Sequence, residues 1–173
     1  MADSRIVTGL FPDRASAERA YSSLAVRGYG SGGVNLVMSD ETRRRDFPQG
    51  QAVATELGSK AAEGAGIGGA IGGTVGAIAA AVAAVGTSLA LPGLGLVIAG
   101  PVAAALAGAG AGGAAGGLVG ALIGWGIPEE RVKAYESGIR EGGILMGARA
   151  RSEDDALAFE NSWRDAHGQL IRS

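Results

Sequence analysis

The chain has 173 residues, and all 15 basic and 17 acidic side chains lie in residues 1–63 or 129–173. The 65 residues between these flanks are uncharged and hold 20 of the 32 glycines together with 19 alanines. Basic and acidic residues nearly balance in both flanks, so the basic field that nucleic-acid binding requires is not expected. The chain has no cysteine, and its one histidine, His167, has no neighbours at ligand spacing, which argues against disulfides and metal sites.

The first 47 residues have the pattern of a strand, a helix and a second strand. Ile6 to Phe11 is rich in β-forming residues, and Asp13 then provides an N-cap for a helix that ends near Gly28. Val34 to Ser39 alternates as a strand with one buried face does. This βαβ opening also lacks the basic and long apolar regions of a secretion signal, so we expect the flanks to stay in the cytoplasm.

The last 46 residues have a similar pattern. Pro128 can begin a helix that runs to about Gly142, and Ile144 to Ala150 reads as a strand. Ser152, followed by Asp155, resembles a capping box for a further helix, which ends at His167-Gly168 before a short strand at residues 169–172.

These patterns predict an α+β fold whose core is a split, ferredoxin-like domain, βαβ plus βαβ, with the helices on one face of an antiparallel sheet. Residues 1–47 and 143–173 form this domain, and 48–63 and 129–142 are connecting helices. The two parts together hold only 78 residues. Such a core is marginal unless the central segment or a partner supports it.

Residues 64–128 predict a long helical hairpin with a turn at Leu91–Gly95, where Pro92 breaks the first helix. Small residues recur every fourth position in both helices, as in a glycine zipper. Each glycine costs roughly 1 kcal/mol relative to alanine inside a helix, so close helix packing must offset the cost. The predicted packing and oligomerisation residues are Gly64, Gly68, Gly72, Gly76, Gly108, Gly112, Gly116, Gly120 and Gly124.

The hairpin is long enough to cross a bilayer, because 28 residues of helix from Gly64 to Leu91 would span ~42 Å. Against a crossing, alanine and glycine insert weakly, and Trp125 is the one residue that reads as an interfacial anchor. If the hairpin spans, the nearby basic residues place both of its ends in the cytoplasm. The alternative is a soluble assembly that buries the same stripes.

Three segments resemble a known family: IVTGLFPDRASAERAYSSLAVRGYG, the glycine- and alanine-rich hairpin, and GIPEERVKAYESGIREGGILMGARA. Together they resemble the bacterial general-stress or heat-induced proteins of the YflT type, in a form with a glycine-zipper insertion. The most specific piece runs from Gly126 through Gly138 to Gly142-Gly143. This resemblance implies a stress-associated protein that is membrane-linked or oligomeric, and it transfers no active site.

The sequence offers only weak signals for a cofactor, metal or lipid site. Gly64-x-Gly66-x-x-Gly69 matches a dinucleotide fingerprint but follows no strand, so we expect no cofactor. The acidic run at 153–155 suits a helix cap better than a cation site. The basic run Arg43, Arg44 and Arg45 is interpreted as a solvated loop or as a contact with an acidic partner or, together with Trp125, with lipid headgroups.

The sequence therefore predicts a non-enzymatic stress-response protein that forms homo-oligomers through its glycine-zipper hairpin and associates with membrane lipid. It would lie at the bacterial inner membrane and face the cytoplasm, or form a large oligomer in the cytoplasm. The alternative function is a soluble, self-assembling scaffold. No catalytic residue, cofactor, metal or nucleic-acid partner is expected.

Overall fold

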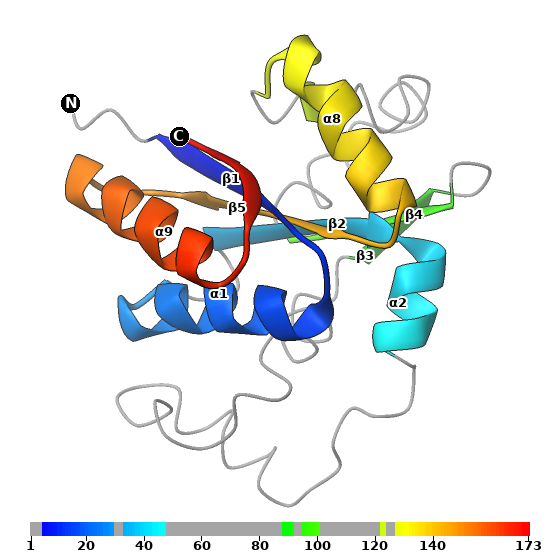
Figure 1. Ribbon diagram of the computed structural model, residues 1–173, viewed down its shortest axis with the longest axis horizontal. Coiled ribbons are helices and arrows are strands. Elements are labelled where there is room, and N and C mark those ends of the chain that lie inside the picture. Colours follow the sequence, from blue (N-terminus) through cyan, green and yellow to red (C-terminus); the bar gives the residue numbers. More distant parts are fainter. Residues whose placement is uncertain (1–4, 30–32, 48–87, 92–94, 101–121, 124–126) are drawn as a thin grey trace, which may run out of the picture.

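A computed structural model describes residues 5–29, 33–47, 88–91, 95–100, 122–123 and 127–173 (Figure 1). It shows a mixed α/β fold built on a six-stranded antiparallel sheet with the order β3-β4-β2-β5-β1-β6. The strands are β1 (Ile6–Phe11), β2 (Val34–Ser39), β3 (Ser88–Leu91), β4 (Leu96–Ala99), β5 (Ile144–Arg149) and β6 (Gln169–Arg172). The helices in this part of the chain are α1 (Arg14–Val26), α2 (Asp40–Asp46), α8 (Glu129–Arg140) and α9 (Glu153–Asp165).

The two ends of the chain interleave in this sheet. Strand β5 from the C-terminal part lies between β1 and β2, with Phe11 opposite Ile144 on one side and Met38 opposite Ile144 on the other. Strand β6 pairs with the far side of β1. The pairs β1–β5, β1–β6 and β2–β5 each join residues more than a hundred positions apart, so neither end of the chain can form this sheet alone.

Helices cover both faces of the sheet (Figure 1). On one face, α1 and α9 bury a core that includes Val7, Phe11 and Trp163. On the other face, α8 packs over residues such as Leu10 and Leu145. Alternate residues of β1 and β5 thus point to opposite cores, as the pleat of a strand requires.

The predicted helix at residues 129–142 is present as α8, and it does more than connect two segments. Its apolar side chains Val132, Tyr135 and Ile139 are fully buried against the sheet. A Cβ at Gly138 would clash with Leu10 Cδ2, so this glycine lets the helix approach β1 closely. The helices of the two predicted βαβ units, α1 and α9, lie on one face of the sheet, whereas α8, predicted as a connecting helix, covers the other face. Helix α8 thus supplies a second core, which supports a domain that would be marginal at 78 residues.

Local sequence explains where the helices begin and end. The backbone N of Ser16 donates to Asp13 Oδ1 at 2.8 Å, and that of Asp155 donates to Ser152 Oγ at 3.1 Å, as N-caps do. At the end of α9, Gly168 N donates to Trp163 O and His167 N donates to Arg164 O. This is a Schellman motif, in which His167 takes a left-handed φ of 64° that favours glycine.

The charge-free segment departs from the predicted helical hairpin. Residues 88–91, expected at the end of a long helix, form strand β3, and β4 follows after the predicted turn. Strand β4 pairs with β2, from Leu36 opposite Ala99 to Ser39 opposite Leu96. The sequence of β4, LVIA, contains two β-branched residues, which suit a strand that packs on both faces.

The glycine stripes themselves lie outside the described residues. This holds for Gly64, Gly68, Gly72, Gly76, Gly108, Gly112, Gly116, Gly120 and Gly124, for Trp125 and for the predicted connecting helix at 48–63. Among the helices that the structure describes, none has the length and apolar character needed to cross a bilayer.

Candidate functional site

The charge-free segment joins the rest of the protein at the end of the sheet where β3 is the edge strand and β4 pairs with β2, next to α2. Strand β4 is buried on both faces: Val97 is 2% exposed in the core under α1 and α9, and Ile98 is 0% exposed in the core under α8. Past β4, Leu122 and Ile127 are buried in the core under α8, and Ile127 N donates to Leu122 O at 3.0 Å. Both the middle and the end of the segment are thus fixed to the domain.

Helix α2 begins directly after β2 and contacts both the turn before β4 and the segment after α8. Ser39 Oγ caps the helix by accepting from Thr42 N at 3.0 Å. Asp40 N donates to Gly95 O at 2.6 Å, which fixes the turn that leads into β4. Thr42 Oγ1 donates to Gly142 O at 3.3 Å, so the end of α8 also meets the helix.

The basic run predicted as a loop or a lipid contact belongs to α2, so the loop interpretation is wrong. Arg43 and Arg44 pair with Asp40, and Arg44 Nη2 lies 2.7 Å from Asp40 Oδ2. Arg45 Nε lies 2.8 Å from Asp46 Oδ1, and this hydrogen-bonded carboxylate raises the pKa of Arg45. Each arginine therefore has an acidic neighbour, which weakens its attraction for an anionic headgroup.

A shallow hollow of about 610 Å³ lies on this edge. Side chains of both charges line it, together with Gly95 of the turn before β4. Its lining residues are Ser39, Asp40, Glu41, Arg44, Arg45 and Gly95. Because two acidic and two basic side chains line it, the hollow offers polar contacts without a field of one sign.

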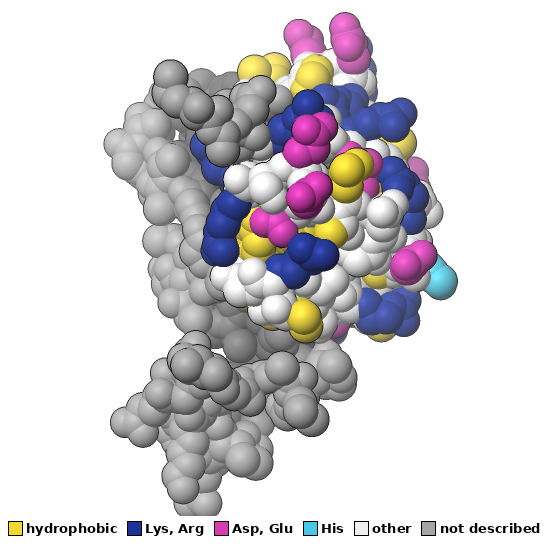
Figure 2. Space-filling model, turned by 90° about the vertical axis from the view of Figure 1, so that its left-hand side faces the viewer, with side chains coloured by type: hydrophobic (Ala, Val, Ile, Leu, Met, Phe, Trp, Pro, Cys, Tyr) yellow, Lys and Arg dark blue, Asp and Glu magenta, His cyan; other side chains and the backbone are white. Residues whose placement is uncertain are grey.

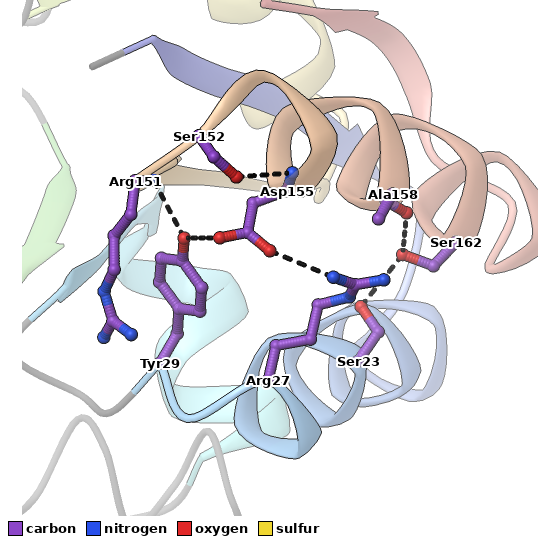
Figure 3. Close-up of polar contacts among 8 residues, drawn as sticks. All are labelled: Ser23, Arg27, Tyr29, Arg151, Ser152, Asp155, Ala158 and Ser162. Carbon is purple, nitrogen blue, oxygen red and sulfur yellow. Dashed lines mark hydrogen bonds and ion pairs between the residues drawn. The ribbon is translucent and has the colours of Figure 1, made fainter. Parts of the chain in front are cut away.

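A second polar cluster joins the end of α1 to the start of α9 (Figure 3). Tyr29 Oη donates to Asp155 Oδ2 at 2.6 Å and accepts from Arg151 N at 2.8 Å. Arg27 Nη1 donates to the other carboxylate oxygen of Asp155 at 2.9 Å. The guanidinium of Arg151 lies over the Tyr29 ring, 4.1 Å from its centroid.

These contacts shift two pKa values in opposite directions. The hydrogen bond from Tyr29 and the contact with Arg27 lower the pKa of Asp155, although partial desolvation opposes them. Burial and the hydrogen bond to Asp155 raise the pKa of Tyr29. Tyr29 is only 3% exposed, so its hydroxyl is closed off from a substrate. The cluster therefore acts as a clamp between two helices.

A third polar contact spans the other face of the sheet. The buried Tyr135 donates its hydroxyl to Leu170 O at 2.9 Å, and Thr8 Oγ1 lies 2.9 Å from the same hydroxyl. The register between β1 and β6 is irregular here, and Leu170 has a φ of 51°. Tyr135 thus satisfies a carbonyl that the irregular ladder would leave without a regular partner.

The remaining predicted site residues do not converge on a reactive centre. In the part of the chain with described placement, no group of acidic or histidine side chains could hold a metal. His167 is exposed at the end of α9, and the acidic run 153–155 forms the first turn of that helix. On the face drawn in Figure 2, the coloured basic and acidic side chains are interspersed.

Sequence reasoning missed the clamp and the anchored edge for different reasons. Tyr29 and Asp155 lie 126 positions apart, and no local pattern pairs them. Helix α2 did carry a signal: Ser39 as cap, acids at Asp40 and Glu41, and arginines in its last turn, the charge order that suits a helix dipole.

Comparisons with protein-family models, curated proteins and solved structures found no match to this chain.

Proposed function

We propose that this chain is a non-enzymatic protein that self-associates through the two glycine-rich runs on either side of the β3–β4 hairpin. The observation that carries the proposal is the position of β4. It lies in the middle of 65 uncharged residues and is paired to β2 of the domain. The α/β domain is then the rigid base that holds both runs.

The composition of the runs supports packing between copies. Glycine recurs every four residues, which leaves a stripe where a second backbone can approach closely. Homo-oligomers let identical stripes meet their own copies across a symmetry axis.

The proposal extends to fold family and location. The order β2-β5-β1-β6, with α1 and α9 on one face, is what a ferredoxin-like unit would have, and we assign the domain to that type. The resemblance to YflT-type proteins supports a role in stress. The protein would then work at the cytoplasmic side of the inner membrane, or as a scaffold-like oligomer in the cytoplasm.

The test is to fill one stripe without changing its neighbour. Gly112→Leu with Gly116→Leu adds bulk to the stripe, and Gly113→Leu with Gly117→Leu adds the same bulk one position further along. Sedimentation velocity of the full chain measures the mass of the assembly, and circular dichroism checks that the domain folds.

We expect the on-stripe variant to lose at least tenfold in association constant and the off-stripe variant to remain near the unmodified chain. Equal masses for all three folded proteins would refute the role of the stripe. An equal loss in both variants would show that bulk anywhere in the run interferes, and the zipper would again be rejected.

A further inference from the structure

The arginines of the domain differ in whether an acidic side chain already neutralises them. Those of α2 pair with Asp40 or Asp46. Arg140 and Arg164 each pair with a glutamate four residues earlier, at 2.7 and 2.9 Å. By contrast, three arginines form no ion pair with any residue of the described ranges, so their charges remain available to a partner. These three are Arg131, Arg149 and Arg172.

The sheet register places two of them on one face, near the start of β1. Arg149 lies opposite Ile6, and Arg172 lies opposite Thr8. Opposite residues of an antiparallel pair share a face, and so do residues two apart in one strand. Thr8 faces α8, because its hydroxyl lies 2.9 Å from that of Tyr135. Two strand spacings and two residue steps separate the Cα atoms of Arg149 and Arg172, which are therefore about 12 Å apart.

Helix α8 adds the third arginine at the same end of the sheet. Gly138 packs on Leu10, and Tyr135, about one turn earlier, contacts Thr8, so α8 runs back along β1 towards the start of that strand. Arg131 lies a further turn earlier on the same side of the helix. The arginine cluster formed in this way comprises Arg131, Arg149 and Arg172, and all three are at least partly exposed.

An exposed apolar side chain lies beside the arginine cluster. Leu170 precedes Arg172 by two residues in β6 and is 49% exposed. Its φ of 51° is unfavourable for a bulky residue, and the hydroxyl of Tyr135 donates to its carbonyl oxygen at 2.9 Å. The fold thus holds a strained residue in place while its side chain stays open to solvent. Such strain is typical of residues that contact a ligand.

Charge and symmetry distinguish the partners that this surface could take. In a twofold dimer a second copy would bring the same arginines to the contact, and like charges would face each other. Nucleic acid is disfavoured by the formal net charge of −2 for the chain. An anionic bilayer offers phosphates to the arginine cluster and an apolar layer to Leu170, which is the combination that interfacial contacts use.

We propose that the arginine cluster and Leu170 form a peripheral contact with the phosphate headgroups of an anionic bilayer. The start of β1 and the C-terminus lie on the left of Figure 1 and α2 lies on the right, so the domain rests on lipid with α2 directed away from it. Figure 2 views the molecule from the lipid-facing side. The inference rests on the proposed function for the membrane location and requires neither the glycine-rich runs nor a spanning helix.

The test is flotation of the full chain with two kinds of vesicle, one of pure phosphatidylcholine and one of equimolar phosphatidylcholine and phosphatidylglycerol. Arg149→Gln with Arg172→Gln removes two charges from the arginine cluster. Arg140→Gln with Arg164→Gln is the matched control, because it removes the same charge from exposed arginines that already pair with glutamate. Circular dichroism checks that each protein folds.

We expect the unmodified chain to float with the vesicles that contain phosphatidylglycerol and to partition poorly to phosphatidylcholine. Each arginine next to an anionic bilayer raises the partition coefficient about fivefold, so Arg149→Gln with Arg172→Gln should lower it about 25-fold. The control pair should lower it by less than about threefold, because its charges are already neutralised locally.

Leu170→Asn tests the apolar part of the contact. Asparagine tolerates a positive φ, so this change removes the apolar side chain without adding strain. We expect it to lower the partition coefficient about threefold or more. Leu157→Asn is the control, because Leu157 is 53% exposed but lies on α9, which covers the other face of the sheet. It should leave partitioning unchanged.

Equal partitioning of the unmodified chain to both kinds of vesicle overturns the proposal, and so does an equal loss in the two arginine pairs. Displacement from the vesicles by millimolar inorganic phosphate at constant ionic strength would assign the cluster to a free anion and would also overturn the lipid contact. Sedimentation velocity without vesicles measures self-association separately, so a failure of the lipid contact and a failure of the proposed assembly are told apart.

Discussion

Replacing Ile98 by alanine tests whether the charge-free segment is part of the sheet. Ile98 is 0% exposed and packs in the core under α8. The change removes three buried carbons at about 0.8 kcal/mol each and leaves a cavity, so we expect it to lower the free energy of unfolding by about 3 kcal/mol. For a chain of this length, that corresponds to a fall in Tm of about 6–12 °C.

The assay is urea unfolding of the full chain, followed by near-ultraviolet circular dichroism. Ile98→Val is the graded variant and should cost about 1 kcal/mol. Ile123→Ala is the matched control, because Ile123 belongs to the same charge-free segment but is 44% exposed. We expect Ile123→Ala to change the free energy of unfolding by less than about 1 kcal/mol.

Similar small effects for Ile98→Ala and Ile123→Ala would refute the pairing of β4 with β2. Such a result would instead suit a segment whose side chains contribute little to the folded domain. A large effect of Ile98→Ala with an unchanged denaturant m-value would show that β4 belongs to the same cooperative unit as the rest of the sheet.

Three further predictions concern the polar contacts and a helix end. The folded state lowers the pKa of Asp155, so the stability that its carboxylate contributes is present above its ordinary pKa of 3.8 and disappears as pH falls through the lower folded value. The difference in unfolding free energy between the unmodified chain and Asp155→Asn should therefore persist at pH 6 and vanish in acid. A difference that does not change with pH would contradict this. His167→Gly relieves the positive φ of His167 and should raise the free energy of unfolding by about 1 kcal/mol in urea titrations, whereas a loss would indicate that the imidazole makes a stabilising contact. Tyr135→Phe leaves Leu170 O without its hydroxyl donor, so it should lower the free energy of unfolding by about 1–3 kcal/mol and speed amide hydrogen exchange in β6. Unchanged exchange would argue against the contact.

Strongly patterned segments of the flanks were predictable from the sequence. Strands at Ile6–Phe11, at Val34–Ser39 and from Ile144 are confirmed because their residues are β-forming and bounded by turn or cap residues. The prediction that Val34–Ser39 has one buried face is wrong, because Val37 is buried in the core under α8 and its neighbours Leu36 and Met38 in the core under α1 and α9. The helix caps at Asp13 and Ser152 are confirmed because capping depends on residues only three positions apart.

The β3–β4 hairpin was not predictable on the same grounds. SLAL and LVIA are short apolar runs, and periodicity does not separate a buried strand of this length from one turn or so of helix. The surrounding glycine spacing favours a helix, whereas pairing of β4 with β2 makes the segment a strand. Such a pairing is a tertiary effect that local sequence does not encode.

The candidate site, too, could be predicted from the sequence only in part. The charge-free segment and its glycine spacing are visible in the sequence, but the place where the segment meets the domain is not. That place depends on hydrogen bonds such as Asp40 N to Gly95 O, which join residues 55 positions apart. The clamp between Tyr29 and Asp155 likewise depends on how α1 and α9 pack.

Sedimentation equilibrium of the unmodified full chain measures self-association without any substitution. One chain has a mass of 17.0 kDa, and we expect a discrete multiple of that mass that dissociates on dilution. A single species of 17.0 kDa at every concentration, with the domain folded, would contradict self-association through the glycine-rich runs.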